Sequence, residues 1–61
     1  MPVVTVETWE GRSVDQKRRL VEVMTDAMVE HFECKRENTF VIIHDIPKES
    51  WAHAGQLSID K

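Results

Sequence analysis

The sequence has only one cysteine, two glycines, two prolines and no tyrosine in its 61 residues. Because Cys34 has no second cysteine to pair with, no disulfide within the chain can add stability to this short protein. A lone thiol fits a reducing compartment, where it usually serves as a small apolar residue. A chain of this length buries only a small part of its surface alone, so we expect it to fold together with a partner.

Long apolar runs are also missing from the sequence. No window approaches the roughly 18 consecutive apolar residues of a membrane-spanning helix. The first residues lack the basic region and the apolar region that together mark a secretory signal. These absences predict a soluble cytoplasmic protein with no membrane partner.

An excess of positive charge is likewise absent, since eleven acidic residues face eight basic ones and the formal net charge is -3. Without a basic face, a nucleic-acid partner is not expected. A small DNA-binding dimer of the β-ribbon type is a distant alternative, disfavoured because that fold has two helices and this sequence predicts one. A metal site is not predicted either, because the spacing of His44, Asp45 and His53 matches no zinc pattern.

Residues 3 to 9 form an alternating run of strand-forming side chains. Val4 and Val6 fall on one face, because successive side chains of a strand point to opposite sides. The other face carries Val3, Thr5, Glu7 and Trp9. This pattern predicts a strand that packs against a helix on one side.

A helix is predicted next, from Val14 to Phe32. Ser13 and Gln16 have the spacing of a capping box, in which the serine hydroxyl accepts from the Gln16 N–H and the Gln16 side chain bonds back. Apolar residues recur at helical spacing at Leu20, Val23, Met24, Ala27, Met28 and His31 or Phe32. These residues are expected to form the apolar face of an amphipathic helix.

A second strand is predicted over residues 39 to 46, whose centre is apolar at consecutive positions. Continuous burial is typical of parallel strands, and the order strand, helix, strand predicts a right-handed βαβ crossover. Pro47 ends this strand, and residues 51 to 59 form a short, weakly strand-like tail.

We therefore predict an α+β fold with one domain, residues 1–61. It consists of a single βαβ unit with a parallel two-stranded sheet and a short C-terminal hairpin or tail. One helix covers only one face of such a sheet. The other face would remain in water, so we expect the fold to be completed by oligomerisation.

The sequence begins Met1-Pro2, and a small residue after the initiator normally allows Met1 to be removed. The nitrogen of an N-terminal proline is a secondary amine that can accept a proton. Burial disfavours the charged ammonium and shifts an amine with a reference pKa of roughly 8 toward neutrality, where it can transfer protons. Pro2 is therefore a candidate general base, provided that Met1 is removed.

These features, in this order, resemble the 4-oxalocrotonate tautomerase family. The segments that carry the resemblance are Met1-Pro2, Glu10-Gly11-Arg12-Ser13, Gln16-Lys17, Val41-Ile42-Ile43 and the stretch from Trp51 to Gly55. The resemblance covers nearly the whole chain. Its most specific parts are the N-terminal proline and the junction that leads into the helix.

The resemblance implies a cofactor-independent tautomerase that moves a proton within an enol or 2-oxo acid substrate. Pro2 matches the family's general base, and Arg12 matches an arginine that a neighbouring subunit contributes to the site. A guanidinium suits this role because it binds a carboxylate with two hydrogen bonds and stabilises developing negative charge. Trp51 matches the family's aromatic pocket residue. The family's assembly implies a homohexamer, a trimer of dimers, with a dimer as the alternative.

Phe40 departs from the family pattern. It occupies the position of a second substrate-binding arginine, so a two-armed grip on the dicarboxylate 2-hydroxymuconate is not expected. Trp9, Phe40 and Trp51 are interpreted instead as apolar walls of the substrate pocket. Lys35 or Arg36, in the connection before the second strand, is an alternative second cation.

Two other functions remain open. The chain could be a noncatalytic or partner subunit of a tautomerase-like oligomer, which follows if Met1 is retained and the Pro2 nitrogen is an amide. It could also be a hydratase or dehalogenase of the wider superfamily, with His53 activating water beside Trp51.

Overall fold

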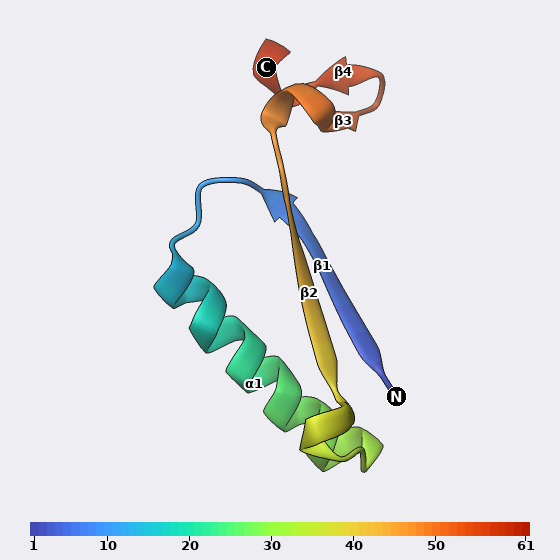
Figure 1. The fold of residues 1–61 in the computed structure, drawn as a ribbon. Helices are drawn as coiled ribbons and strands as arrows, with labels where there is room; N and C mark the ends of the chain where they lie inside the picture. The colour runs from blue at the N-terminus through green and yellow to red at the C-terminus, as the bar shows by residue number, and fades with distance from the viewer.

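The computed structural model describes all 61 residues. Strand β1 (Val3–Trp9), helix α1 (Val14–Phe32) and strand β2 (Phe40–Ile46) form the body of the chain (Figure 1). Short strands β3 (Ala52–His53) and β4 (Gln56–Leu57) follow. Three single-turn 3-10 helices join or end these elements: η1 (Arg36–Asn38), η2 (Lys48–Ser50) and η3 (Ser58–Asp60).

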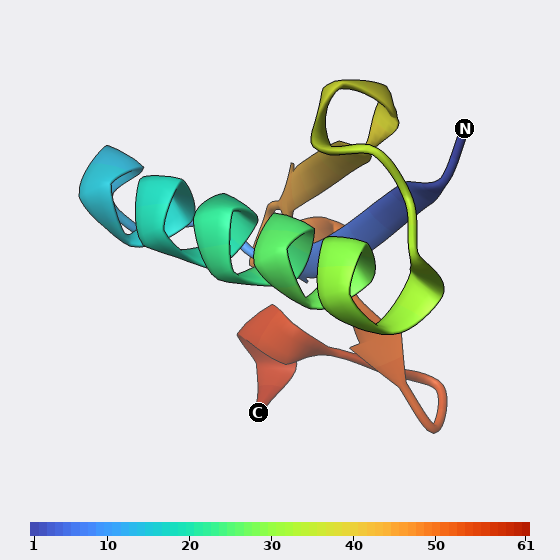
Figure 2. The same cartoon turned by 90° about the horizontal axis from the view of Figure 1, so that it is seen from below.

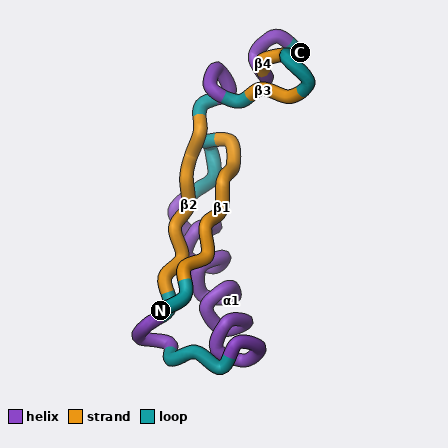
Figure 3. Tube along the Cα trace, turned by 90° about the vertical axis from the view of Figure 1, so that its right-hand side faces the viewer, coloured by secondary structure: helices purple, strands orange, loops and turns teal.

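Strands β1 and β2 pair in parallel, in a register that runs from Val3 opposite Phe40 to Trp9 opposite Ile46. Helix α1 lies along one face of this pair (Figures 2 and 3). On that face the strands present half-buried side chains from Val4, Val6, Thr8, Val41 and Ile43. The predicted α+β fold, with one βαβ unit and a parallel two-stranded sheet, is confirmed.

Helix α1 begins where the capping box predicts. The Ser13 N–H donates to Gln16 Oε1 at 2.9 Å, and the Gln16 N–H donates to Ser13 Oγ at 3.1 Å. This exchange satisfies backbone groups that the first turn of a helix leaves without partners. At the other end Glu33 adopts the left-handed conformation, which stops the helix directly after Phe32.

The helix contacts the sheet through a face that differs from the predicted one. Its half-buried side chains are Lys17, Val21, Met24, Thr25, Met28 and Val29. Of the predicted apolar face, only Met24 and Met28 belong to this set, whereas Val23 and Phe32 are 63% and 73% exposed. The prediction of the helix face was therefore partly wrong. Apolar residues occupy two neighbouring stripes of α1, and tertiary packing decides which stripe meets the sheet.

The C-terminal tail is a minimal antiparallel hairpin in which Ala52 pairs with Leu57 and His53 pairs with Gln56. Ala54 and Gly55 form its turn with φ angles of 53° and 81°. Two positive φ angles in a two-residue loop match the right-handed twist of the strands. The hairpin extends beyond the end of the strand pair (Figures 1 and 3).

The chain does not build a core of its own. No residue is buried, and on the outer face of the sheet Val3, Phe40 and Ile42 are 52%, 47% and 45% exposed. The radius of gyration is 14.5 Å, against about 10.5 Å for a compact chain of this length. An isolated two-stranded sheet is at best marginally stable in water. None of the helices has both the length and the apolar character that crossing a membrane requires.

Candidate active site

Pro2 lies directly before β1 and is half-buried. Its carbonyl accepts a hydrogen bond of 3.0 Å from the N–H of Phe40, which is the first residue of β2. This bond fixes the N-terminal residue against the start of the neighbouring strand. Phe40 therefore lies beside Pro2, with its ring about half exposed on the outer face of the sheet.

Arg12 lies in the connection between β1 and α1. The Glu10 N–H donates to the Ile46 carbonyl at 3.1 Å, which holds the start of this connection to the end of β2. Gly11 follows with a φ of 119°, a conformation that side-chain-bearing residues rarely adopt. The Arg12 guanidinium is exposed and makes no hydrogen bond or ion pair within the chain. It is therefore free to bind an anion.

An open pocket of about 250 Å³ lies next to Arg12, between the start of α1 and the sheet. Its lining combines apolar and polar side chains: Val6, Thr8, Arg12, Gln16, Lys17, Leu20 and Ile43. Pro2 does not line it, so in one chain this pocket cannot be the proton-transfer site predicted around Pro2.

Trp9 and Trp51 meet where the hairpin joins the body of the chain. Their ring centroids are 6.2 Å apart with an interplanar angle of 75°, a favourable edge-to-face geometry. Lys48 Nζ lies 4.6 Å from the centroid of the Trp9 ring, within the range of a cation–π interaction. Two of the three predicted aromatic walls, Trp9 and Trp51, thus form one surface, and a cation that the sequence motif does not single out lies beside it.

The predicted site residues fall into two groups. Pro2 and Phe40 lie at the start of the strand pair, and Trp9, Arg12 and Trp51 lie at its far end. The seven residues of β1, at about 3.3 Å each, separate these groups by roughly 20 Å. A single chain therefore does not bring the predicted catalytic pair together.

The alternative cations and the histidine differ in their surroundings. Arg36 forms an ion pair with Asp26 of α1, so its guanidinium already has an anionic partner. Lys35 makes no ion pair, although its carbonyl accepts a hydrogen bond of 2.8 Å from Thr39 Oγ1. His53 is exposed on β3. No three His, Cys, Asp or Glu residues are arranged to hold a metal ion.

The family model for the tautomerase enzymes matches residues 2–61. The chain therefore belongs to the tautomerase family, and it is an isomerase. It is 44% identical over 55 residues to a 2-hydroxymuconate tautomerase of Comamonas testosteroni, covering 90% of this chain and 87% of the relative.

Two solved structures match over nearly their whole length. YwhB, a homologue of 4-oxalocrotonate tautomerase, has a TM-score of 0.94 and 40% identity, with 98% of each chain covered. A heterohexameric 4-oxalocrotonate tautomerase from Chloroflexus aurantiacus has a TM-score of 0.90 and 25% identity, with 98% of this chain and 97% of that chain covered. The resemblance found in the sequence is thus confirmed for the family and the fold.

Proposed function

We propose that this protein is a cofactor-independent tautomerase that acts on 2-hydroxy-2-enoate or 2-oxo acid substrates, with the N-terminal amine of Pro2 as the general base. The family supports proton transfer as the chemistry. The 2-hydroxymuconate tautomerase of Comamonas testosteroni supports an unsaturated hydroxy acid as the substrate class. The protein's one thiol suits a reducing compartment, and we therefore propose that the protein is cytoplasmic.

One observation carries the proposal: Pro2 and Arg12 lie at opposite ends of β1. A small substrate cannot contact both residues across roughly 20 Å of strand. It can do so where the Arg12 end of one chain meets the Pro2 end of another. The active site would then form between subunits, and the isolated chain would be inactive.

The outer face of the sheet supports this assembly. Val3, Phe40 and Ile42 remain about half exposed there, and covering such a patch with a second copy removes apolar surface from water at about 25 cal/mol per Å². We propose a homohexamer, with a dimer as the alternative. A hexameric relative, the heterohexamer from Chloroflexus aurantiacus, supports the larger assembly.

In the proposed reaction, the neutral amine of Pro2 takes a proton from the enol hydroxyl, or from a carbon beside a carbonyl. It then returns the proton to another carbon of the conjugated system. One bond to hydrogen breaks and one forms, so no oxidant or cofactor is required. Arg12 would bind the carboxylate and stabilise the negative charge that develops between the two steps.

Phe40 supports a choice among substrates. Its ring lies beside Pro2 and offers no hydrogen-bond donor, so an anionic group placed against it would lose water without gaining a partner. Trp9 and Trp51 would add a second aromatic surface from the Arg12 end of a neighbouring chain. We therefore propose substrates with one carboxylate and an apolar or aromatic tail.

Two synthetic chains that differ by one residue test the catalytic proposal. One begins at Pro2 and the other retains Met1, which converts the Pro2 nitrogen into an amide with no basic lone pair. Turnover of a simple enol should be present in the first and absent in the second, with both chains assembled to the same size. Equal turnover in the two chains would exclude Pro2 as the base, and no turnover in either would favour a noncatalytic subunit.

A further inference from the structure

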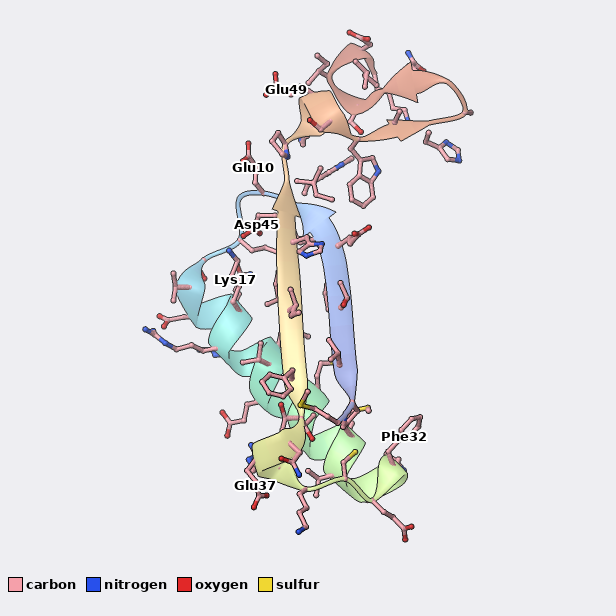
Figure 4. All side chains as sticks on the ribbon, turned by 45° about the vertical axis from the view of Figure 1, so that its right-hand side comes forward. Glu10, Lys17, Phe32, Glu37, Asp45 and Glu49 are labelled. Atoms are coloured by element: carbon pink, nitrogen blue, oxygen red, sulfur yellow. The ribbon has the colours of Figure 1, made fainter.

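Lys17 and Asp45 form an ion pair that links the first turns of α1 to the end of β2 (Figure 4). It is the most sheltered of the five ion pairs in the chain, with side chains that are 30% and 32% exposed. The next most sheltered pair, between Glu7 and His44, has side chains that are more than half exposed. The Lys17–Asp45 pair is therefore screened less by water than any other.

This pair lies beside the pocket that Arg12 lines. Lys17 and Arg12 both contribute to the pocket wall. Asp45 lies opposite Thr8 in the strand register, and Thr8 lines the same pocket. The Lys17–Asp45 ion pair and the uncommitted Arg12 thus lie at the same end of the sheet.

The other carboxylates near Arg12 in the sequence are paired or lie elsewhere. Asp15 bonds to Arg18 at 2.8 Å on the outside of α1, where the two side chains are 78% and 73% exposed. Glu10 borders a separate hollow with Lys48 and Glu49. Asp45 is therefore the sheltered carboxylate at the end of the sheet where Arg12 lines the pocket.

We propose that Lys17 is a positioning residue for the active site: by neutralising Asp45, it keeps the Arg12 guanidinium free for a substrate carboxylate. The inference rests on the proposed function, because it assigns Lys17 a role only if Arg12 binds the substrate. Without Lys17, Asp45 would compete with the substrate for Arg12. The alternative is that the pair only fastens α1 to β2.

A double-mutant cycle separates these two roles. Lys17→Met keeps most of the apolar stem and removes the charge, so Asp45 loses its partner. Asp45→Asn removes the competing carboxylate, and the double variant Lys17→Met/Asp45→Asn removes both charges. Arg18→Met is the matched control, because it releases the exposed Asp15 and replaces a cation of the same helix in the same way.

The measurements are kcat and KM for phenylenolpyruvate, together with the melting temperature and the assembly size of each variant. Lys17→Met should raise KM by about three- to tenfold with a smaller change in kcat. The reason is that, in the free form of this variant, Arg12 would be paired with Asp45 and would have to leave it to bind the substrate. Asp45→Asn should leave KM at or below the wild-type value. The double variant should return KM to within about twofold of wild type, and Arg18→Met should not change it.

A purely structural pair gives a different pattern. Lys17→Met and Asp45→Asn would then impair activity to the same degree and in step with the melting temperature, and the double variant would not recover. That result would overturn the inference while leaving the proposed function intact. If Lys17→Met does not assemble, a double variant that folds and has a KM well above wild type would overturn the inference, and one with a normal KM would support it.

The proposed function is checked in the same series. Wild-type turnover that is lost in Arg12→Ala establishes that Arg12 is required before the cycle is interpreted. If wild-type turnover does not depend on Arg12, the role of Arg12 and the inference about Lys17 both fail. A dependence on Arg12 without recovery in the double variant overturns the inference alone.

Discussion

Pro2 and Arg12 flank the same strand, Pro2 immediately before β1 and Arg12 three residues after it ends. The strand that connects them also holds them apart. Because Phe40 and Ile46 bind the two ends of this segment through backbone hydrogen bonds, the separation is fixed by the parallel register. A site that uses both residues therefore requires two chains.

Mixing two impaired variants tests whether the site is shared between chains. Pro2→Ala and Arg12→Ala should each lose activity. When equimolar variants are unfolded together and reassembled, about a quarter of the sites should combine an intact Pro2 with an intact Arg12 from a neighbour. Turnover of the mixture should recover to roughly that fraction of wild type.

The control for this experiment is the same mixture assembled separately and combined without unfolding. It should keep the low activity of the separate variants for as long as subunits do not exchange. No recovery in the co-assembled mixture, with assembly confirmed by sedimentation, would show that both residues act within one chain.

The base can be tested by its own substitution. Native protein should have the mass of a chain without Met1, because only that form has a free amine on Pro2. Pro2→Ala replaces the secondary amine of the proline ring with a more flexible primary amine, and we expect turnover of a simple enol to fall at least about tenfold, since a general base contributes roughly 10² to 10⁴. Unchanged turnover in Pro2→Ala would be incompatible with the mechanism.

The elements that could be predicted from the sequence are those set by neighbouring residues. The bounds of α1 follow from the capping box of Ser13 and Gln16 and from the periodicity after it. The strand β1 follows from its alternation, and β2 begins one residue later than predicted, at Phe40. These signals come from residues that are close together in the sequence, so they can be read without knowing the tertiary structure.

Features set by distant residues could not be predicted. Lys17 and Asp45 are 28 positions apart, and only the packing of α1 on β2 brings them together. The choice between the two apolar stripes of α1 depends on the same packing. The roles of Pro2 and Arg12 were inferred from a motif, which identifies residue types and their order but gives no distance between them.

The assembly can be tested on the outer face of the sheet. At micromolar concentration, sedimentation should detect no folded species of 7.1 kDa, because a single chain buries no residue. Ile42→Lys would place a charge in the centre of the proposed contact, and burying an unpaired charge costs several kcal/mol. We expect this variant to dissociate and to lose helical circular dichroism.

Glu22→Lys is the control for this substitution. It places a lysine on an exposed position of α1, away from the outer face of the sheet, and should leave the assembly intact. A wild-type chain that sediments as a folded monomer, or an Ile42→Lys variant that assembles normally, would contradict the proposed contact.

The choice of substrate is expected to depend on Phe40. Because the ring beside Pro2 provides no hydrogen-bond donor, kcat/KM for phenylenolpyruvate should at least equal that for the dicarboxylate 2-hydroxymuconate. Phe40→Arg should improve only the dicarboxylate, by about tenfold or more, because a charge-assisted hydrogen bond contributes roughly 1.5 to 3 kcal/mol. Phe40→Leu, which keeps an apolar side chain, should not improve turnover of the dicarboxylate.

A wild-type preference for 2-hydroxymuconate of about a hundredfold, roughly 2.7 kcal/mol in transition-state binding, would mean that another cation binds the second carboxylate. Lys35, which has no ion pair, would then be the first residue to replace.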